Sequence, residues 1–324
     1  MRTIVLGAGA VGGVVAARLG ASGQQVVVVA RGPHLDAIRR GGLTLATPTD
    51  RSSVEVAAVA SPHEIDWQED DVVFLAVKSQ DTYTALNDLV QVAPPTTPVV
   101  CLQNGVANEP MALRWFRDVY GVVVMLPATH LEPGVVAQHS SPVAGLLDIG
   151  RWPSGADRLC ARLSDLFEEA GFGSRVLDDV SRWKHTKLLV SLSNVVGALC
   201  EKDERRDRLM ELAREEGRRC LEAAGIAFAP DEEDRDRRGD LLDVQAAVGQ
   251  PRQGGSSWQS LARGTGTIET DYFNGEIVRI GRLHGVPTPV NELLQQLARD
   301  HVRERRRPGS VRASEVIEEL ERAT

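Results

Sequence analysis

The sequence has few residues that could form a metal or redox centre. Its 324 residues include four cysteines and seven histidines. Cys101, Cys160, Cys200 and Cys220 are far apart and lack the C-x-x-C spacing of redox and zinc sites. The histidines lack the H-E-x-x-H pattern of metalloproteases. We therefore expect no metal site and reduced, mostly structural thiols.

Long apolar runs and basic patches are also missing. No run approaches the roughly 18 apolar residues that indicate a membrane span, and no signal peptide precedes the first predicted strand. The formal net charge of -8, without a basic patch interleaved with aromatic residues, argues against a nucleic-acid partner. These absences predict a cytoplasmic protein that binds neither membranes nor nucleic acids.

The first 31 residues carry the most informative pattern. An apolar run over residues 3–6 leads into Gly7-Ala8-Gly9-Ala10-Val11-Gly12, and a second run over residues 25–30 ends at Arg31. This is the order of strand, phosphate-binding turn, helix and strand in a dinucleotide-binding unit. Gly7 would permit the sharp turn, Gly9 would let the backbone approach a pyrophosphate, and Gly12 would allow close packing of helix and strand. The alternative is a plain turn in another α/β protein.

Arg31 occupies the position that decides between the two nicotinamide cofactors. An NAD-preferring unit usually has Asp or Glu there to bind the ribose 2′-hydroxyl, whereas no acidic residue occurs between Gly13 and Leu35. A guanidinium can hold a 2′-phosphate through paired hydrogen bonds. The sequence therefore predicts NADP(H), and the alternative is that Arg31 is an ordinary solvated arginine.

Two domains are expected, because 324 residues exceed what one core usually supports. Residues 71–77 and 97–102 are apolar runs typical of buried parallel strands, and each is followed by polar residues. Further strands are predicted at 121–127, 134–139, 143–149 and near 175, with a helix over about 157–170. From Ser181 onward helical periodicity dominates. The prediction is an α/β protein with a Rossmann-type domain, residues 1–178, and an all-α domain, residues 179–324.

A helix over residues 184–199 has a polar line beside an apolar face. At about 100° per residue, Lys187, Ser191 and Asn194 fall on one line, and apolar residues cluster next to it. Such a line suits a cleft wall, although a plain amphipathic helix with its polar residues outward explains the spacing equally well. Farther along, Glu269 is predicted in the first turn of a helix, where acidic residues are common because of the helix dipole.

Together these motifs resemble the ketopantoate reductases, also called 2-dehydropantoate 2-reductases, over nearly the whole chain. The matching segments are Gly7–Gly12, Arg31, Val77-Lys78, Gln103-Asn104-Gly105, Trp183 with Lys187-Leu188-Leu189, Ser256-Ser257, Glu269–Gly275 and His284–Pro287. The resemblance implies a Rossmann domain followed by a helical domain similar to the C-terminal domain of 6-phosphogluconate dehydrogenase. It also implies NADPH-dependent reduction of a small 2-oxo acid, with ketopantoate reduced to pantoate.

The resemblance also implies roles for single residues. Lys187 would stabilise the carbonyl oxygen and donate the proton, with Lys184 as a competitor, and Glu269 would hydrogen-bond the reacting hydroxyl. Asn104 would orient cofactor and substrate. Ser191, Asn194 and Ser257 would bind the substrate. The cofactor would be bound by Gly7, Ala8, Gly9, Ala10, Val11, Gly12, Arg31 and Lys78.

One departure from the family pattern bears on the substrate. Family members commonly carry asparagines four and eight residues after the lysine, whereas this chain has Ser191 and reaches Asn194 one residue early. The alternatives to ketopantoate are a related 2-oxo acid, a different carbonyl or imine, or a non-catalytic role as an NADP(H) sensor. Apolar stripes at 207–224 and 290–302 are either core or dimer surface, which leaves a homodimer possible.

Overall fold

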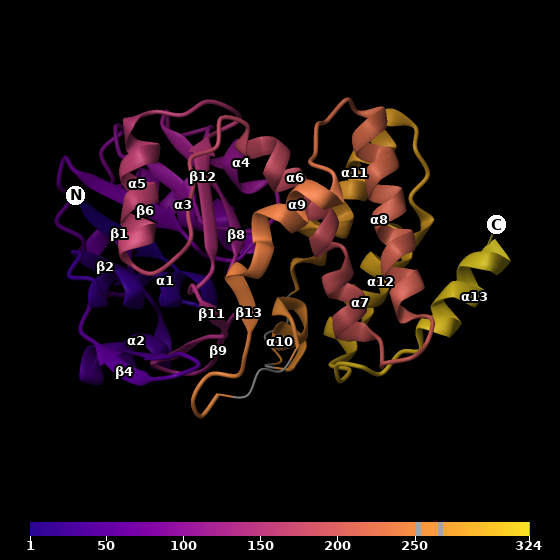
Figure 1. Ribbon diagram of the computed structural model, residues 1–324, viewed down its shortest axis with the longest axis horizontal. Helices are drawn as coiled ribbons and strands as arrows, with labels where there is room; N and C mark the ends of the chain where they lie inside the picture. Colours follow the sequence, from indigo (N-terminus) through magenta and orange to yellow (C-terminus); the bar gives the residue numbers. More distant parts are fainter. Residues whose placement is uncertain (251–253, 263, 265–267, 324) are drawn as a thin grey trace. The chain divides into compact units, whose positions relative to one another are not determined.

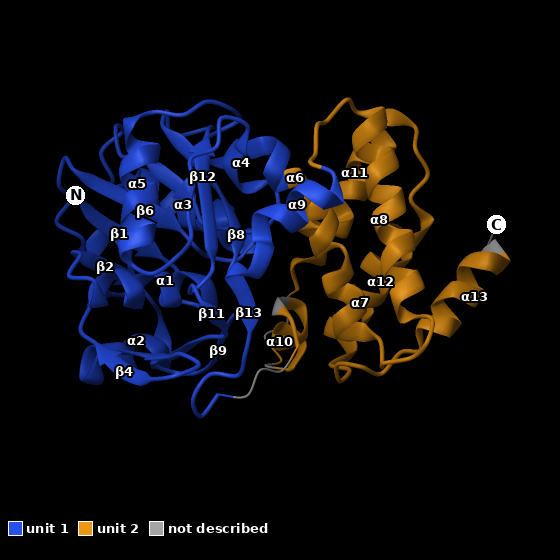
Figure 2. Ribbon diagram, in the orientation of Figure 1, with its two compact units in different colours: residues 1–184, 230–252 blue, residues 185–229, 253–324 orange. Residues whose placement is uncertain are grey.

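The computed structural model divides the chain into two compact units (Figures 1 and 2). It describes residues 1–250, 254–262, 264 and 268–323. Unit 1 comprises Met1–Lys184 and Pro230–Arg252, and unit 2 comprises His185–Ala229 and Gln253–Thr324. A single boundary near Asp178 therefore does not describe the division, because a later segment of the chain returns to unit 1.

A seven-stranded sheet forms the centre of unit 1. Its strand order is β5-β2-β1-β6-β7-β8-β12, and all neighbours are parallel except β8 and β12. The strands are β1 (Arg2–Leu6), β2 (Val26–Val29), β5 (Ala57–Val59), β6 (Asp71–Leu75), β7 (Val99–Cys101), β8 (Val119–Met125) and β12 (Leu146–Arg151). The chain order reverses between β1 and β6, and open α/β sheets bind ligands beyond the carboxyl ends of strands at such a point. The predicted Rossmann-type fold is confirmed.

Helices cover both faces of this sheet. Successive side chains of a strand point to opposite faces, so the continuous apolar runs of these strands place apolar side chains on both. Val5 and Phe74 pack on one side with α1 (Ala10–Ala21), α2 (Gly32–Gly41) and α5 (Arg158–Glu169). Ile4 and Leu75 pack on the other side with α3 (Thr82–Val90) and α4 (Asn108–Ala112). Two 3-10 turns, η1 (Pro62–Glu64) and η2 (Ser79–Asp81), precede β6 and α3.

A second sheet in unit 1 has the order β4-β3-β10-β9 and lies against α1. Its strands are β3 (Leu43–Ala46), β4 (Arg51–Val54), β9 (Ala128–Glu132) and β10 (Val135–Gln138). The strand predicted near Arg175 is not formed as a continuous element. That segment makes only isolated bridges, from Gly173 to Leu146 and from Val176 to Ile149.

The segment that returns to unit 1 contains a strand, although helical periodicity dominates the sequence from Ser181 onward. It contains α9 (Asp231–Arg238), η3 (Gly239–Leu241) and β13 (Leu242–Val244), and β13 pairs antiparallel with β11 (Ser140–Pro142). The guanidinium of Arg237 forms an ion pair of 2.5 Å with Asp148, whose side chain is only 1% exposed. The dense charge of this segment is typical of a solvated surface, but one of its arginines, Arg237, neutralises a buried carboxylate.

The regular elements described in unit 2 are all helical, and the longest of them, α8 (Arg206–Ala223), packs with one face against other helices of the unit (Figure 1). The chain enters this unit through α6 (Val180–Ser191), which begins in unit 1. The other elements are α7 (Ser193–Leu199), α10 (Ser256–Ala262), η4 (Glu269–Tyr272), α11 (Asn274–His284), α12 (Pro289–Glu304) and α13 (Ala313–Ala323). The apolar stripes of α8 and α12 are buried in this unit, so they form core.

A buried carboxylate holds three helices of unit 2 together. Glu216 on α8 accepts hydrogen bonds of 2.9 Å from the backbone N–H groups of Val290 and Asn291, which satisfies free donors at the start of α12. Burial raises the pKa of Glu216, and these hydrogen bonds act in the opposite direction. Asn291 Oδ1 in turn accepts a 2.9 Å hydrogen bond from Asn274 at the start of α11.

Candidate active site

The phosphate-binding turn joins β1 to α1 in unit 1. Gly7 has a φ of +101°, and a Cβ added there would lie 2.9 Å from the Val77 nitrogen. A Cβ on Gly12 would lie 2.1 Å from the Gly7 carbonyl oxygen, so a side chain would force α1 away from β1. At Gly9, by contrast, an added Cβ would meet nothing within 4 Å. The turn, completed by Ala8, Ala10 and Val11, thus fits a pyrophosphate at a helix N-terminus.

Arg31 follows β2 and is the residue immediately before α2. Its side chain is 74% exposed, and its guanidinium lies 3.8 Å from the Asp88 carboxylate. An exposed contact of this length contributes little. Most of the hydrogen-bonding capacity of this guanidinium therefore faces solvent at the end of the second strand.

Buried side chains join the ends of β6 and β7. Gln103 donates hydrogen bonds to the Val77 carbonyl (2.7 Å) and to the Thr82 hydroxyl (2.9 Å), and Asn108 donates to the Asn104 carbonyl (3.1 Å). Among the described residues, nothing donates to Asn104 Oδ1, although this atom is buried. A buried acceptor without a donor is costly, and a ligand N–H or O–H would satisfy it. Lys78, half-buried, also lies at the end of β6, immediately before η2.

Lys184, the competing lysine, is held inside unit 1. Its ammonium donates to the Gln103 carbonyl (2.8 Å) and forms an ion pair with Glu109 on α4. The two side chains are 2% and 0% exposed. Burial raises the pKa of Glu109, and the neighbouring ammonium opposes that shift. The pair attaches the first half of α6 to the turn that carries Asn104.

The polar line predicted on one helix extends over two consecutive helical segments. α6 ends at Ser191 and α7 begins at Ser193, but Leu192 between them has helical backbone angles (φ -58°, ψ -28°), so the helical spacing continues from Lys187 to Asn194. The Ser191 hydroxyl is buried and donates to the Lys187 carbonyl (2.9 Å), whereas Lys187 and Asn194 are half-buried. α10, which carries the buried Ser257, packs against α7.

Glu269 lies in the first turn of the short 3-10 helix η4, and not in the first turn of an α-helix. α11 begins five residues later, at Asn274. The Asn274 amide donates to the carbonyl of Leu192 (3.4 Å) and to Asn291 (2.9 Å). These buried contacts fix the start of α11, and the residues before it form a separate, tighter turn.

The predicted site residues fall into two sets. Unit 1 contains the cofactor set, Gly7–Gly12, Arg31, Lys78 and Asn104, and unit 2 contains Lys187, Ser191, Asn194, Ser257 and Glu269. Thr82, Asn108 and Glu109 support the turn at Asn104 but are not among the predicted site residues. Thr82 and Asn108 are 26 residues apart and share a 2.9 Å hydrogen bond, and no motif links such positions.

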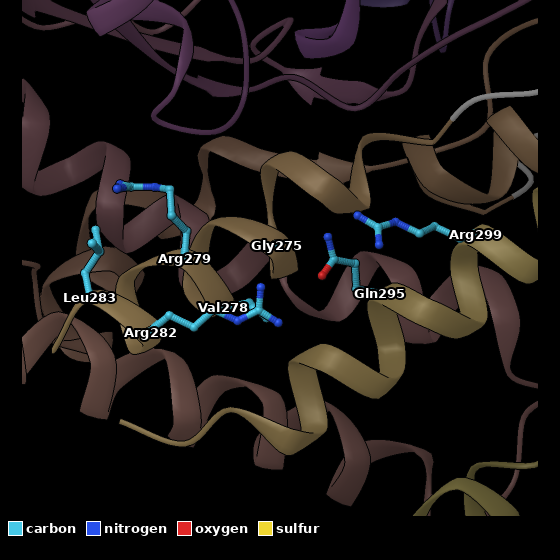
Figure 3. A pocket seen from close by; sticks show the side chains of 7 residues that line it. All are labelled: Gly275, Val278, Arg279, Arg282, Leu283, Gln295 and Arg299. Carbon is cyan, nitrogen blue, oxygen red and sulfur yellow. The ribbon is translucent and has the colours of Figure 1, made fainter. Parts of the chain in front are cut away.

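A pocket of about 290 Å³ lies between α11 and α12 in unit 2 (Figure 3). None of the predicted site residues lines it. Its guanidiniums already have carboxylate partners: Arg279 pairs with Glu276, Arg282 with Glu292, and Arg299 with Asp271. The pocket therefore has no surplus positive charge, and we assign no ligand to it.

The described residues include neither a cluster of metal-ligating side chains nor a membrane-spanning helix. No group of three or more His, Cys, Asp or Glu side chains in this part of the chain could hold a metal ion. No helix described is long and apolar enough to cross a membrane. All four cysteines are buried and free.

The chain matches family models over most of its length. The model described as ketopantoate reductase PanE/ApbA matches residues 3–154, and the model of the C-terminal part of the same family matches residues 181–302. The chain belongs to the ketopantoate reductase family. The resemblance deduced from the motifs is thereby confirmed, and the family consists of NAD(P)H-dependent oxidoreductases.

Individual ketopantoate reductases agree with this membership. A 2-dehydropantoate 2-reductase of Pyrococcus horikoshii is 30% identical, with 92% of this chain and 97% of the relative covered. One from Archaeoglobus fulgidus is 28% identical with the same coverage. The crystal structure of a PanE/ApbA family ketopantoate reductase from Ralstonia eutropha JMP134 has a TM-score of 0.79 and 30% identity, and the alignment covers 94% of this chain and 99% of that one.

Proposed function

We propose that this protein reduces the ketone of a small 2-oxo acid with NADPH, and that 2-dehydropantoate is the first substrate to test. The observation that carries the proposal is full-length membership of the ketopantoate reductase family combined with retention of Lys187 and Glu269. When bound, NADPH supplies the hydride that reduces the ketone carbon. The phosphate-binding turn supports this choice of ligand, because Gly9 leaves open space beside the start of α1.

In this proposal Lys187 is the proton donor. Its ammonium stabilises the negative charge that develops on the carbonyl oxygen and then protonates it, and a positioned general acid contributes about 10²- to 10⁴-fold to the rate. Glu269 accepts a hydrogen bond from the hydroxyl that forms. The buried ion pair between Lys184 and Glu109 supports this choice, because it occupies the other lysine near this position.

Replacing Lys187 tests the proton donor directly. We expect Lys187→Met to bind NADPH as the unmodified protein does and to lose about 10²- to 10⁴-fold in turnover. Lys202→Met, at an exposed lysine, is the matched control and should retain full activity. Full activity of Lys187→Met would remove the lysine from this role.

We also propose that Arg31 selects NADPH over NADH by binding the 2′-phosphate. The exposed guanidinium at the end of β2 supports this, and the loss of its charge-assisted hydrogen bonds should weaken NADPH binding by at least about tenfold. Arg31→Ala should leave NADH binding nearly unchanged. Arg40→Ala, at an exposed arginine on α2, the helix that follows Arg31, is the control, and equal weakening of both cofactors by Arg31→Ala would contradict the assignment.

The substrate side of the proposal assigns Asn104, Ser191, Asn194 and Ser257 to the polar groups of the 2-oxo acid. Ser191 replaces the asparagine common in the family, and its hydroxyl already bonds to the helix backbone. A related 2-oxo acid is therefore the second candidate.

Following NADPH absorbance with 2-dehydropantoate and a panel of 2-oxo acids, other ketones and imines tests the substrate. If NADPH is oxidised only with another carbonyl compound or an imine, that compound takes the place of 2-dehydropantoate as the proposed substrate. If NADPH binds but no compound is turned over, the result favours a sensor. A homodimer and a cytoplasmic location stay predictions. Sedimentation of the purified protein would test the dimer.

A further inference from the structure

His34 links the phosphate-binding turn to another part of unit 1. It lies in the first turn of α2, three residues after Arg31. One ring nitrogen, Nε2, lies 2.7 Å from the carbonyl oxygen of Ala8, in the turn itself. The other, Nδ1, accepts a hydrogen bond of 2.8 Å from the backbone N–H of Gly134, between β9 and β10.

These two contacts assign the protonation state of the ring. The N–H of Gly134 can only donate, so Nδ1 must be an unprotonated acceptor. The carbonyl of Ala8 can only accept, so Nε2 must carry the proton. Neutral His34 in the Nε2–H tautomer satisfies both partners, and neither the cation nor the other tautomer does.

The bond to Ala8 also fixes the direction of the next amide. The cis peptide bonds among the described residues are those before Pro142 and Pro153, so the bond from Ala8 to Gly9 is trans. In a planar trans peptide the C=O and N–H groups point in opposite directions. Because His34 holds the Ala8 carbonyl on its own side, the Gly9 N–H points to the other side, at the position that precedes α1.

We propose that His34 is a positioning residue for the dinucleotide: its neutral ring, anchored by the Gly134 N–H, holds the Ala8–Gly9 peptide in the orientation used for phosphate binding, and protonation of Nδ1 removes that anchor. A proton on Nδ1 would face the Gly134 N–H, so two donors would meet at 2.8 Å. His34 does not touch the ligand and acts through the backbone of the turn. This inference rests on the proposed function, in which a nicotinamide dinucleotide occupies the turn.

The surroundings of the ring favour its neutral form. Burial lowers the pKa of His34, and the hydrogen bond to Ala8 acts in the opposite direction. A cation in the first turn of α2 would also be opposed by the helix dipole. The phosphate turn, Gly7–Gly12, has no titratable side chain.

The β9–β10 hairpin carries two titratable residues, and one of them, His130, contacts the ring. The ring of His130 lies 4.2 Å from that of His34, measured between centroids, and its Nδ1 donates to the Val135 carbonyl (3.0 Å). Glu132 accepts a hydrogen bond from Gln250 (3.3 Å). The two imidazole rings are tilted by 46° to each other, so His130 covers part of the His34 ring.

The tautomer can be measured without any cofactor. Nitrogen–proton correlation spectra of the ligand-free protein, with His34 assigned by comparison with His34→Gln, distinguish the two neutral forms. We expect the Nε2–H tautomer and a pKa below the ordinary value of about 6.5. An Nδ1–H tautomer, or a ring that is protonated at neutral pH, would overturn the proposal.

The effect on the cofactor is measured as the dissociation constant for NADP+, by calorimetry across a pH series. His34→Phe keeps a ring and loses both hydrogen bonds, so we expect about tenfold weaker binding at pH 7.5, whereas His34→Gln retains a donor and an acceptor and should stay within about threefold. His63→Phe, at an exposed histidine in η1, is the matched control and should bind as the unmodified protein does.

The pH series separates positioning from a structural role. Because the neutral form of His34 is the competent one, binding by the unmodified protein should weaken relative to His34→Gln as the pH falls through the pKa of His34. The titration of the ligand's own phosphate is common to both proteins and cancels. Parallel pH profiles, or unchanged binding by a folded His34→Phe, would refute the proposal.

Two outcomes remain distinguishable from such a refutation. If His34→Phe does not fold, as judged by circular dichroism, the comparison with His34→Gln still decides. If the unmodified protein binds no NADP+, the proposed function fails, and the tautomer in the ligand-free protein still tests what His34 does to the turn.

Discussion

The ion pair between Lys184 and Glu109 predicts a large loss of stability when the lysine is replaced. Lys184→Met keeps much of the aliphatic chain, which packs beside Gly121, and removes only the ammonium. Glu109, with 0% of its side chain exposed, then has no counterion. Breaking a buried pair in this way costs about 3–5 kcal/mol, because an uncompensated charge stays in the interior.

The loss should depend on pH, with a defined sign. Burial already raises the pKa of Glu109, and Lys184 is what opposes that rise, so Lys184→Met raises this pKa further. A carboxyl whose pKa is higher in the folded state contributes most to stability below its unfolded value of about 4.3, and the contribution falls as the pH rises towards the folded value. The variant should therefore be closer to the unmodified protein at pH 5.5 than at pH 8.

Urea unfolding at these two pH values measures the effect. Lys202→Met, at an exposed lysine, is the control and should change the free energy of unfolding by less than about 0.5 kcal/mol. The double variant Lys184→Met/Glu109→Leu should recover much of the loss, because it removes the buried charge as well. A Lys184→Met protein as stable as the control, or equally destabilised at both pH values, would refute the reasoning.

Two more predictions concern unit 1. Gly12→Val should abolish NADPH binding, measured by fluorescence titration, because its Cβ would lie 2.1 Å from the Gly7 carbonyl oxygen. The control is Gly41→Ala, where an added Cβ meets nothing within 4 Å, and this variant should bind NADPH normally. NADPH binding by a folded Gly12→Val would contradict the prediction. Asp157→Ala should lower the free energy of unfolding by about 1–2 kcal/mol, because Asp157 accepts hydrogen bonds from two N–H groups at the start of α5 and from the Tyr120 hydroxyl (2.8 Å). Burial tends to raise the pKa of Asp157, but these bonds outweigh that effect and lower the pKa. The contribution of Asp157 to the free energy of unfolding should therefore be lost as the pH falls below about 4. If Asp157→Ala destabilises the protein just as much at low pH, this reasoning is wrong.

The central sheet could be predicted because its strands are continuous apolar runs bounded by polar residues. The run at 71–77, for example, became β6, with its polar successors Lys78 and Ser79 at the ligand edge of the sheet. β13 could not be predicted in this way. It has three residues, follows a charged helix, and forms because β11 is there to pair with it.

In the candidate site, too, the features set by neighbouring residues could be predicted and those set by distant residues could not. The glycine turn is local in sequence, and its geometry agrees with the motif at Gly7 and Gly12. The turn at Glu269 ends just before Asn274, whose amide bonds to the Leu192 carbonyl, 82 residues away in the chain. Helical periodicity is a property of neighbouring residues, so it carries no information about a contact between segments so far apart in the chain.

The return of residues 230–250 to unit 1 affects how the protein is made. On the ribosome, the stretch from Met1 to Lys184 is complete before the chain that carries Arg237 has been synthesised. Until then the carboxylate of Asp148 lacks its 2.5 Å partner. A recombinant fragment that ends at Lys184 would therefore lack part of unit 1, and fragments designed to represent this unit should include the segment that begins at Pro230.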